Sequence, residues 1–99
     1  MIHHIVLFWL KDNKDTELID RTVALLRSMR GKIPGLISIE AGRDVVGSAR
    51  SCDICLSTIF ESREALDTYR THPVHLPVQA HMHDVMERSS SADFEVPQA

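Results

Sequence analysis

The most informative segment of the chain lies at its start and is the apolar run Ile2-His3-His4-Ile5-Val6-Leu7-Phe8-Trp9-Leu10. Alternate residues of a β-strand point to opposite faces of its sheet, and both alternating sets of this run are apolar. One set contains His4, Val6, Phe8 and Leu10, and the other contains Ile5, Leu7 and Trp9. The run therefore predicts a strand that is covered on both faces.

Apolar residues at helical spacing predict the helices. Asp15 is a good N-cap for the first helix, which we expect to end near Arg30 because Gly31 follows it. Ser62 caps a short second helix, which Pro73 ends. A further helix is expected from Pro73 or Pro77 to residue 87.

Three more strands are expected after the first, at residues 36–41, 52–60 and 92–96, with a weak polar stretch at 88–91 before the last one. Residues 42–51 read as a polar loop. The order β-α-β-β-α-α-β predicts an α+β, ferredoxin-like subunit with an antiparallel sheet. We expect residues 1–99 to form a single domain, since this length is enough for one and too short for two.

Composition excludes several classes of protein. The net charge of −3 shows no basic surface for nucleic acid, and five aromatic residues (three Phe, one Trp and one Tyr) are too few for a base-stacking platform. The apolar run at residues 5–10 is too short to span a bilayer, and it lacks the basic flank of a signal peptide. We therefore expect a cytoplasmic protein that binds neither nucleic acid nor membranes.

Cys52 and Cys55 form the only cysteine motif, C-D-I-C. A zinc site of this type needs a second pair, and a thioredoxin-like site needs the pair at the start of a helix. Ile54, Leu56 and Ile59 instead indicate a strand, on which positions i and i+3 point to opposite faces. We expect unpaired and chemically inert thiols.

The apolar set Ile5, Leu7 and Trp9 also predicts a partner subunit. In a ferredoxin-like subunit the helices cover one face of the sheet and leave the other bare, and a contiguous bare apolar patch is unusual for a monomer. A second copy stacked on that face buries these residues. A C-terminal segment folded over the sheet is the competing explanation, which few residues remain to provide. We therefore expect a homodimer with Ile5, Leu7 and Trp9 at its interface.

Four motifs occur in an order that resembles one known family: residues 4–12, Ile33-Pro34-Gly35, Phe60-Glu61-Ser62 and Tyr69-Arg70-Thr71-His72-Pro73-Val74-His75. Together they are similar to the stress-responsive dimeric α/β-barrel family over nearly the whole chain. The H-P-x-H segment and the opening strand are the most specific parts. The resemblance implies a ferredoxin-like subunit and a homodimer.

The resemblance also implies roles for single residues. A plant polyketide cyclase of this family closes its substrate by an intramolecular aldol condensation, and its catalytic His aligns with His75. A supporting Tyr aligns with Tyr69, and a His of its first strand aligns with His4. The plant enzyme has a second Tyr in its first helix, whereas Tyr69 is the only Tyr here, and Pro77 is expected to interrupt the helix after His75. A different substrate is therefore implied.

These residues suggest a concrete chemistry. A neutral imidazole at His75 can accept a proton at pH 7 while Tyr69 donates to a developing enolate. Because a buried polar group needs a partner, we expect His4 to bond to His75 or Tyr69. Val6, Phe8 and Leu26 are the candidate ligand-binding residues that line the pocket. A structural role for His75, bonded to a backbone carbonyl, is the alternative.

No cofactor is expected, because the chain has no glycine-rich phosphate loop. A zinc or nickel site formed by His4, His72 and His75 is an alternative, but no acidic residue is obviously placed to orient these rings. We therefore expect no metal site. His72, which precedes Pro73, is expected to cap the turn or to face solvent. Asp93 is expected to be a turn or rim charge, as are Asp44 and Asp53.

Three functions remain open at this point. The first is a cofactor-free lyase, cyclase or isomerase acting on a small carbonyl compound, with His75 as its general base. The second is a non-catalytic protein that binds a small apolar ligand or protects against stress. The third is a cofactor-independent monooxygenase, because fold alone does not decide function.

Overall fold

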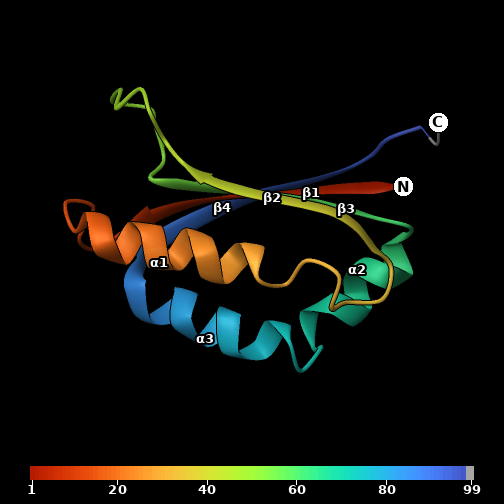
Figure 1. Ribbon diagram of the computed structural model, residues 1–99. Helices are drawn as coiled ribbons and strands as arrows, with labels where there is room; N and C mark the ends of the chain where they lie inside the picture. Colours follow the sequence, from red (N-terminus) through yellow and green to blue (C-terminus); the bar gives the residue numbers. More distant parts are fainter. Residues whose placement is uncertain (98–99) are drawn as a thin grey trace.

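The computed structural model describes residues 1–97. Its elements follow the chain in the order β1 (Ile2–Leu10), α1 (Thr16–Arg27), β2 (Leu36–Arg43), β3 (Ile54–Phe60), α2 (Arg63–Arg70), α3 (His75–Val85) and β4 (Met86–Glu95). The strands form one antiparallel sheet in the order β2-β3-β1-β4. All three helices lie on one side of this sheet (Figure 1). The predicted α+β, ferredoxin-like architecture is confirmed.

Local side-chain chemistry explains where α1 and α2 begin. The Asp15 side chain accepts a hydrogen bond from the Leu18 N–H (3.0 Å), and the Ser62 hydroxyl accepts one from the Ala65 N–H (3.1 Å). Both capping predictions are confirmed. The first helix ends at Arg27, three residues before the expected end, because the following turn is tightened by bonds between residues three apart.

β4 is twice as long as expected. It begins at Met86 and includes the polar stretch 88–91, for which the prediction of weak structure was wrong. The reason is tertiary: β4 pairs with β1 from Trp9↔Arg88 to Ile2↔Glu95. Hydrogen bonding to β1 places these serine-rich residues in the sheet although their side chains have low strand propensity.

α3 begins at His75 and runs through Pro77 without a break. Pro77 is the third residue of this helix, where a backbone N–H has no partner within the helix. The expectation that Pro77 interrupts the helix was therefore wrong. His75 consequently lies in the first turn of a continuous helix that packs beneath the sheet (Figure 1).

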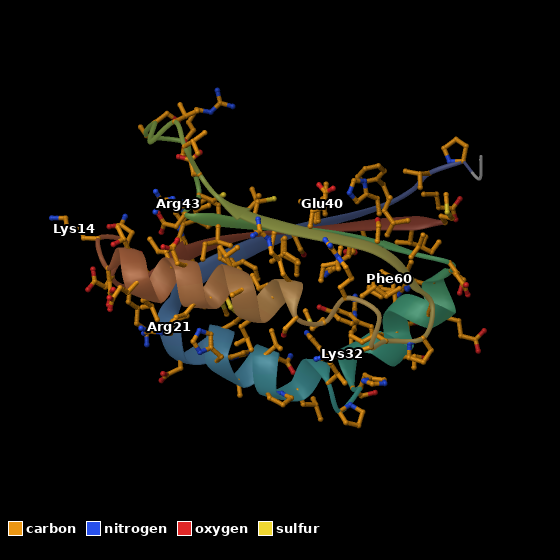
Figure 2. The ribbon with its side chains drawn as sticks, viewed as in Figure 1. Lys14, Arg21, Lys32, Glu40, Arg43 and Phe60 are labelled. Carbon is orange, nitrogen blue, oxygen red and sulfur yellow. The ribbon has the colours of Figure 1, made fainter. Side chains whose placement is uncertain are left out.

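The core lies between the sheet and the helices. Ile54 and Phe60 of β3, Leu26 of α1 and Leu66 of α2 are each at most 1% exposed. Figure 2 shows Phe60 pointing into this layer, whereas Glu40 projects from the other side of the sheet. We call these the covered face and the open face.

The open face is flanked by two segments that rise on its side. The loop at residues 44–53 and residues 96–97 after β4 both extend away from the helices (Figure 1). Val45 and Val46 at the loop are 90% and 77% exposed. These two segments lie on either side of the open face.

Cys52 and Cys55 are free thiols, as predicted. Burial raises the pKa of both, so they remain protonated and weakly nucleophilic at neutral pH. β3 begins at Ile54, two residues later than expected, so only Cys55 lies on it. Within residues 1–97, no helix is long and apolar enough to cross a membrane.

Candidate functional site

A cavity of about 300 Å³ lies between the covered face and α3. Its wall contains the six candidate site residues from the sequence, namely His4, Val6, Phe8, Leu26, Tyr69 and His75. Further apolar walls come from Leu56, Val78, Met82 and Met86, and further polar ones from Arg70, Gln79, His83, Ser89 and Ser91. Elements distant in the chain thus converge on one space.

Two larger hollows, of about 660 and 640 Å³, lie at the edge of β2 and beneath the 44–53 loop. Their walls contain charged groups such as Arg27, Glu40 and Arg43, but no histidine and no tyrosine. Size alone does not indicate chemistry. The smaller cavity is the better candidate because it combines an apolar wall with a few convergent polar groups.

His75 is held by the end of α2. Its Nδ1 donates a hydrogen bond to the carbonyl oxygen of Arg70 (3.3 Å). Because a carbonyl only accepts, the proton is on Nδ1 and Nε2 carries the free lone pair. Desolvation by burial lowers the pKa of His75 below its usual 6.5, and the nearby His4 acts in the same direction. The ring is therefore a neutral base at pH 7.

Tyr69 lies against His75 with ring centroids 4.0 Å apart. It is 3% exposed, and burial raises its pKa to about 12. Its hydroxyl forms no hydrogen bond with residues 1–97. Every fully buried side-chain oxygen or nitrogen in those residues has a hydrogen-bond partner, so this hydroxyl is not fully buried. The hydroxyl is thus open to the cavity, where it remains protonated and can donate.

His4 faces the same cavity from β1, with its ring 6.2 Å from that of Tyr69. Its Nδ1 bonds to Asp93 Oδ1 (2.5 Å) rather than to Tyr69 or His75, so the expected partner was wrong. The cause is strand register, because His4 and Asp93 are paired residues of β1 and β4. This bond leaves Nε2 of His4 as the nitrogen available to a ligand.

Asp93 is the site residue that sequence reasoning missed. It was expected to be a turn or rim charge, whereas it orients a cavity imidazole from the adjacent strand. The only signal that could have found it is the β1–β4 register, which requires that β4 be recognised as a full strand.

The prediction that Asp53 is a turn or rim charge was also wrong. Its carboxylate accepts a hydrogen bond from the Leu10 N–H (2.7 Å) and connects β1 to the start of β3. Asp44 accepts bonds from the backbone of its own turn, as expected.

Two further histidines, His72 and His81, form local structural bonds. Nδ1 of His72 accepts the Val74 N–H (3.1 Å), which confirms its capping role in the turn. His81 bonds to the buried Thr22 hydroxyl (2.9 Å) and links α3 to α1. Across residues 1–97, no three His, Cys, Asp or Glu side chains are arranged to hold a metal ion. The alternative set of His4, His72 and His75 does not come together.

The open face holds the second set of β1 residues. Ile5, Leu7 and Trp9 are partly exposed there, and Trp9 is held by a bond from its Nε1 to the Ser51 carbonyl (3.0 Å). The guanidinium of Arg88 lies 3.9 Å from the Trp9 ring centroid. His3 also lies on this face, where it bonds to Ser57 and contacts Phe94.

Comparison with known proteins adds two kinds of similarity. The sequence profile of a family described as "Stress responsive A/B Barrel Domain" matches residues 2–96. A search of curated proteins found no match.

Solved structures resemble the fold closely. A dimeric ferredoxin-like protein of unknown function from Thermobifida fusca superposes with a TM-score of 0.86 at 21% identity, covering 96% of this chain and 90% of that one. A dimeric protein of unknown function from Bacteroides fragilis gives 0.82 at 24% identity, covering 96% and 95%. The hydroxynitrile lyase from Passiflora edulis gives 0.82 at 16% identity, covering 99% and 94%.

Proposed function

This chain belongs to the stress responsive A/B barrel domain family, and from that premise we propose that it is a homodimeric, cofactor-free enzyme. Its reaction moves a proton on a small carbonyl compound bound in the cavity between the sheet and α3. His75 is the general base, Tyr69 the hydrogen-bond donor, and His4 a second polar group held by Asp93. Aldol-type lyase and cyclase reactions and keto–enol isomerisation proceed through such a step, and in hydroxynitrile cleavage the same base takes the hydroxyl proton as the carbonyl forms and cyanide leaves.

The observation that carries the proposal is the pairing of His75 with Tyr69. Burial lowers the pKa of the first and raises that of the second, so both are neutral at pH 7. One side chain can then accept a proton while its neighbour donates a hydrogen bond, with their rings 4.0 Å apart. Opposite shifts of adjacent titratable groups are typical of acid–base sites.

The proposed step is balanced within these residues and the substrate. Nε2 of His75 takes the proton from the carbon next to the carbonyl, and the C–H electron pair moves to form the enolate. The Tyr69 hydroxyl hydrogen-bonds to the enolate oxygen, where the negative charge develops. The imidazolium then returns its proton to the product. The Passiflora neighbour supports lyase chemistry on this type of fold.

The homodimer is part of the same proposal. The open face presents Ile5, Leu7 and Trp9 to solvent, and a second copy stacked on it removes this apolar surface from water. The projecting 44–53 loop supports this arrangement, because it can reach over the edge of a subunit stacked on that face (Figure 1). The Thermobifida and Bacteroides neighbours are described as dimeric.

The proposal also includes a cytoplasmic location. Two unpaired thiols are typical of proteins in a reducing compartment such as the cytoplasm.

The test measures hydrogen–deuterium exchange next to the carbonyl of small alkyl and aryl ketones by NMR, together with cleavage of hydroxynitriles. His75→Asn should lower the rate on any active compound by about 100-fold or more, and Tyr69→Phe should lower it less. His81→Asn is the matched control, since His81 bonds to Thr22 outside the cavity wall. A His75→Asn rate equal to that of the unchanged protein contradicts the role of the base.

A non-catalytic binding protein is the second candidate. One observation favours it: the Nδ1 bond of His75 to the Arg70 carbonyl also joins the ends of α2 and α3, which is a structural role. This candidate predicts that ligands bind in the cavity without turnover. It further predicts that His75→Asn changes affinity only modestly.

A further inference from the structure

The two ends of the cavity wall carry different side chains. Tyr69, His75 and His4 mark one end, whereas Met82 and Phe8 lie further along α3 and β1. Seven residues of helix from His75 to Met82 span about 10 Å, and four residues of strand from His4 to Phe8 span about 13 Å. The space is therefore elongated. We call the end where α3 begins the polar end and the end with Phe8 and Met82 the apolar end, although Ser89 and His83 border the latter.

Arg70 adds a permanent positive charge to the polar end. It is the last residue of α2, directly after Tyr69, and its own carbonyl holds His75. Its guanidinium forms no ion pair and no hydrogen bond with residues 1–97. By contrast, Arg63 on the same helix bonds to Asp67 (3.2 Å). Arg70 thus keeps all its donors for a ligand.

The cavity wall contains no carboxylate among the described residues. The Oδ1 of Asp93 bonds to His4, and Asp93 and Glu95 line a neighbouring hollow that Arg70 also borders. The charged and titratable groups that line the cavity itself are Arg70, the Tyr69 hydroxyl and the imidazoles of His4, His75 and His83. Such a wall repels cations and favours an anion at the polar end.

We infer that the cavity binds a small amphipathic acid, with its carboxylate on Arg70 and its hydrocarbon chain toward Met82. An arginine fork matches the two oxygens of a carboxylate, and this arginine has no competing partner in the described chain. The apolar end accepts the hydrocarbon part through Phe8, Val78 and Met82. The inference rests on the proposed function, since it names the class of compound for the same cavity.

The experiment compares octanoate with octanamide by isothermal titration at pH 7.5 on the whole chain. The two probes share a chain and differ in charge. Octanoate should bind at least tenfold more tightly, and this advantage should shrink as salt is raised. Arg70→Gln should weaken octanoate by about 10- to 100-fold, the usual range for a charge-assisted hydrogen bond, and leave octanamide unchanged. Arg63→Gln is the control and should leave both affinities unchanged.

Equal binding of the two probes, or an unchanged octanoate affinity in Arg70→Gln, overturns the inference while leaving the proposed small-molecule site intact. Failure of both probes to bind overturns the inference as well. Because binding is measured without turnover, a loss of the proposed catalysis in His75→Asn does not bear on this result. The failures of the two proposals are therefore distinguishable.

Discussion

The two faces of the sheet are made by the same four strands and differ in what covers them. On the covered face Ile54 and Phe60 are fully buried beneath the helices. On the open face Ile5, Leu7 and Trp9 remain partly exposed, although they alternate with covered-face residues along one strand. The chain therefore buries one of its two apolar surfaces itself and leaves the other partly exposed, where we propose that a second copy packs.

The same difference between the two faces determines where the candidate catalytic groups lie. Two polar groups on the helices that face the covered side of the sheet are largely buried, and burial shifts their pKa values: that of His75 falls and that of Tyr69 rises to about 12. On the open face, the polar side chains of Ser57 and His3 bond to each other across neighbouring strands. The chain's own helices enclose the candidate site, whereas we propose that a second copy covers the open face.

The largest effect is expected on the open face. Leu7→Asp places a charge at the centre of the proposed interface, and each dimer carries two copies of the change. Losing two buried leucines alone costs about 3–6 kcal/mol of association free energy, at about 1.5–3 kcal/mol each. Light scattering should show a fall to the mass of one chain. Leu76→Asp is the control, because Leu76 lies on α3 and is 46% exposed; a Leu7→Asp protein that stays dimeric argues against this interface.

On the covered face, the matched change is loss of a core side chain. Ile54→Ala should lower the free energy of unfolding by about 2–5 kcal/mol, because the site is closed on all sides and leaves a cavity. Ile37→Ala removes the same atoms from a residue that is 52% exposed and should cost less than about 1 kcal/mol. Urea unfolding at one protein concentration measures both. Similar losses of unfolding free energy in the two variants would show that burial does not set the cost of removing the side chain at these positions.

Sequence reasoning succeeded where one local pattern decides the structure. The alternation in residues 2–10 predicted β1 and its two faces, and Asp15 and Ser62 marked the starts of α1 and α2. These inferences need no knowledge of long-range pairing. The candidate residues His4, Tyr69 and His75 came instead from the resemblance to the family, and all three line the cavity.

It failed where a distant segment decides the structure. Ser89, Ser90 and Ser91 have no apolar pattern, and they are strand because β1 provides hydrogen-bond partners along their whole length. The error affected the site as well: the expected last strand, residues 92–96, contained Asp93, but its pairing with β1 was not predicted, so nothing placed Asp93 opposite His4. Pro77 was misjudged for a similar reason, because its effect depends on whether the helix begins before or after His75.

The His4–Asp93 pair gives a smaller prediction at the edge of the covered face. Asp93→Asn replaces an acceptor-only group with an amide that can also donate, so it no longer requires the proton on Nδ1 of His4. We expect two tautomers of His4 in the imidazole ¹⁵N spectrum and a roughly tenfold loss of any exchange activity. Glu95→Gln, two residues along the same strand, should change neither quantity. A single unchanged tautomer in Asp93→Asn would show that Asp93 does not orient the ring.

The smallest expected effect is the pH dependence that His75 contributes to folding. Because burial disfavours its charged form, the folded chain binds this proton more weakly than the unfolded chain, whose pKa is the usual 6.5. The contribution is therefore complete above pH 6.5 and is lost as the pH falls through the lower pKa of the folded state. His75→Asn should remove it, so the free energy of unfolding should fall less steeply with acidification than in the unchanged protein. Urea unfolding between pH 5 and 7.5 measures this slope, and His83→Asn, which alters an exposed histidine of the same helix, should leave it unchanged. The same lowered pKa predicts that the proposed exchange rate rises little above pH 7, because the base is then already mostly deprotonated. A rate that rises only above pH 7 would mean that the group accepting the proton is not His75.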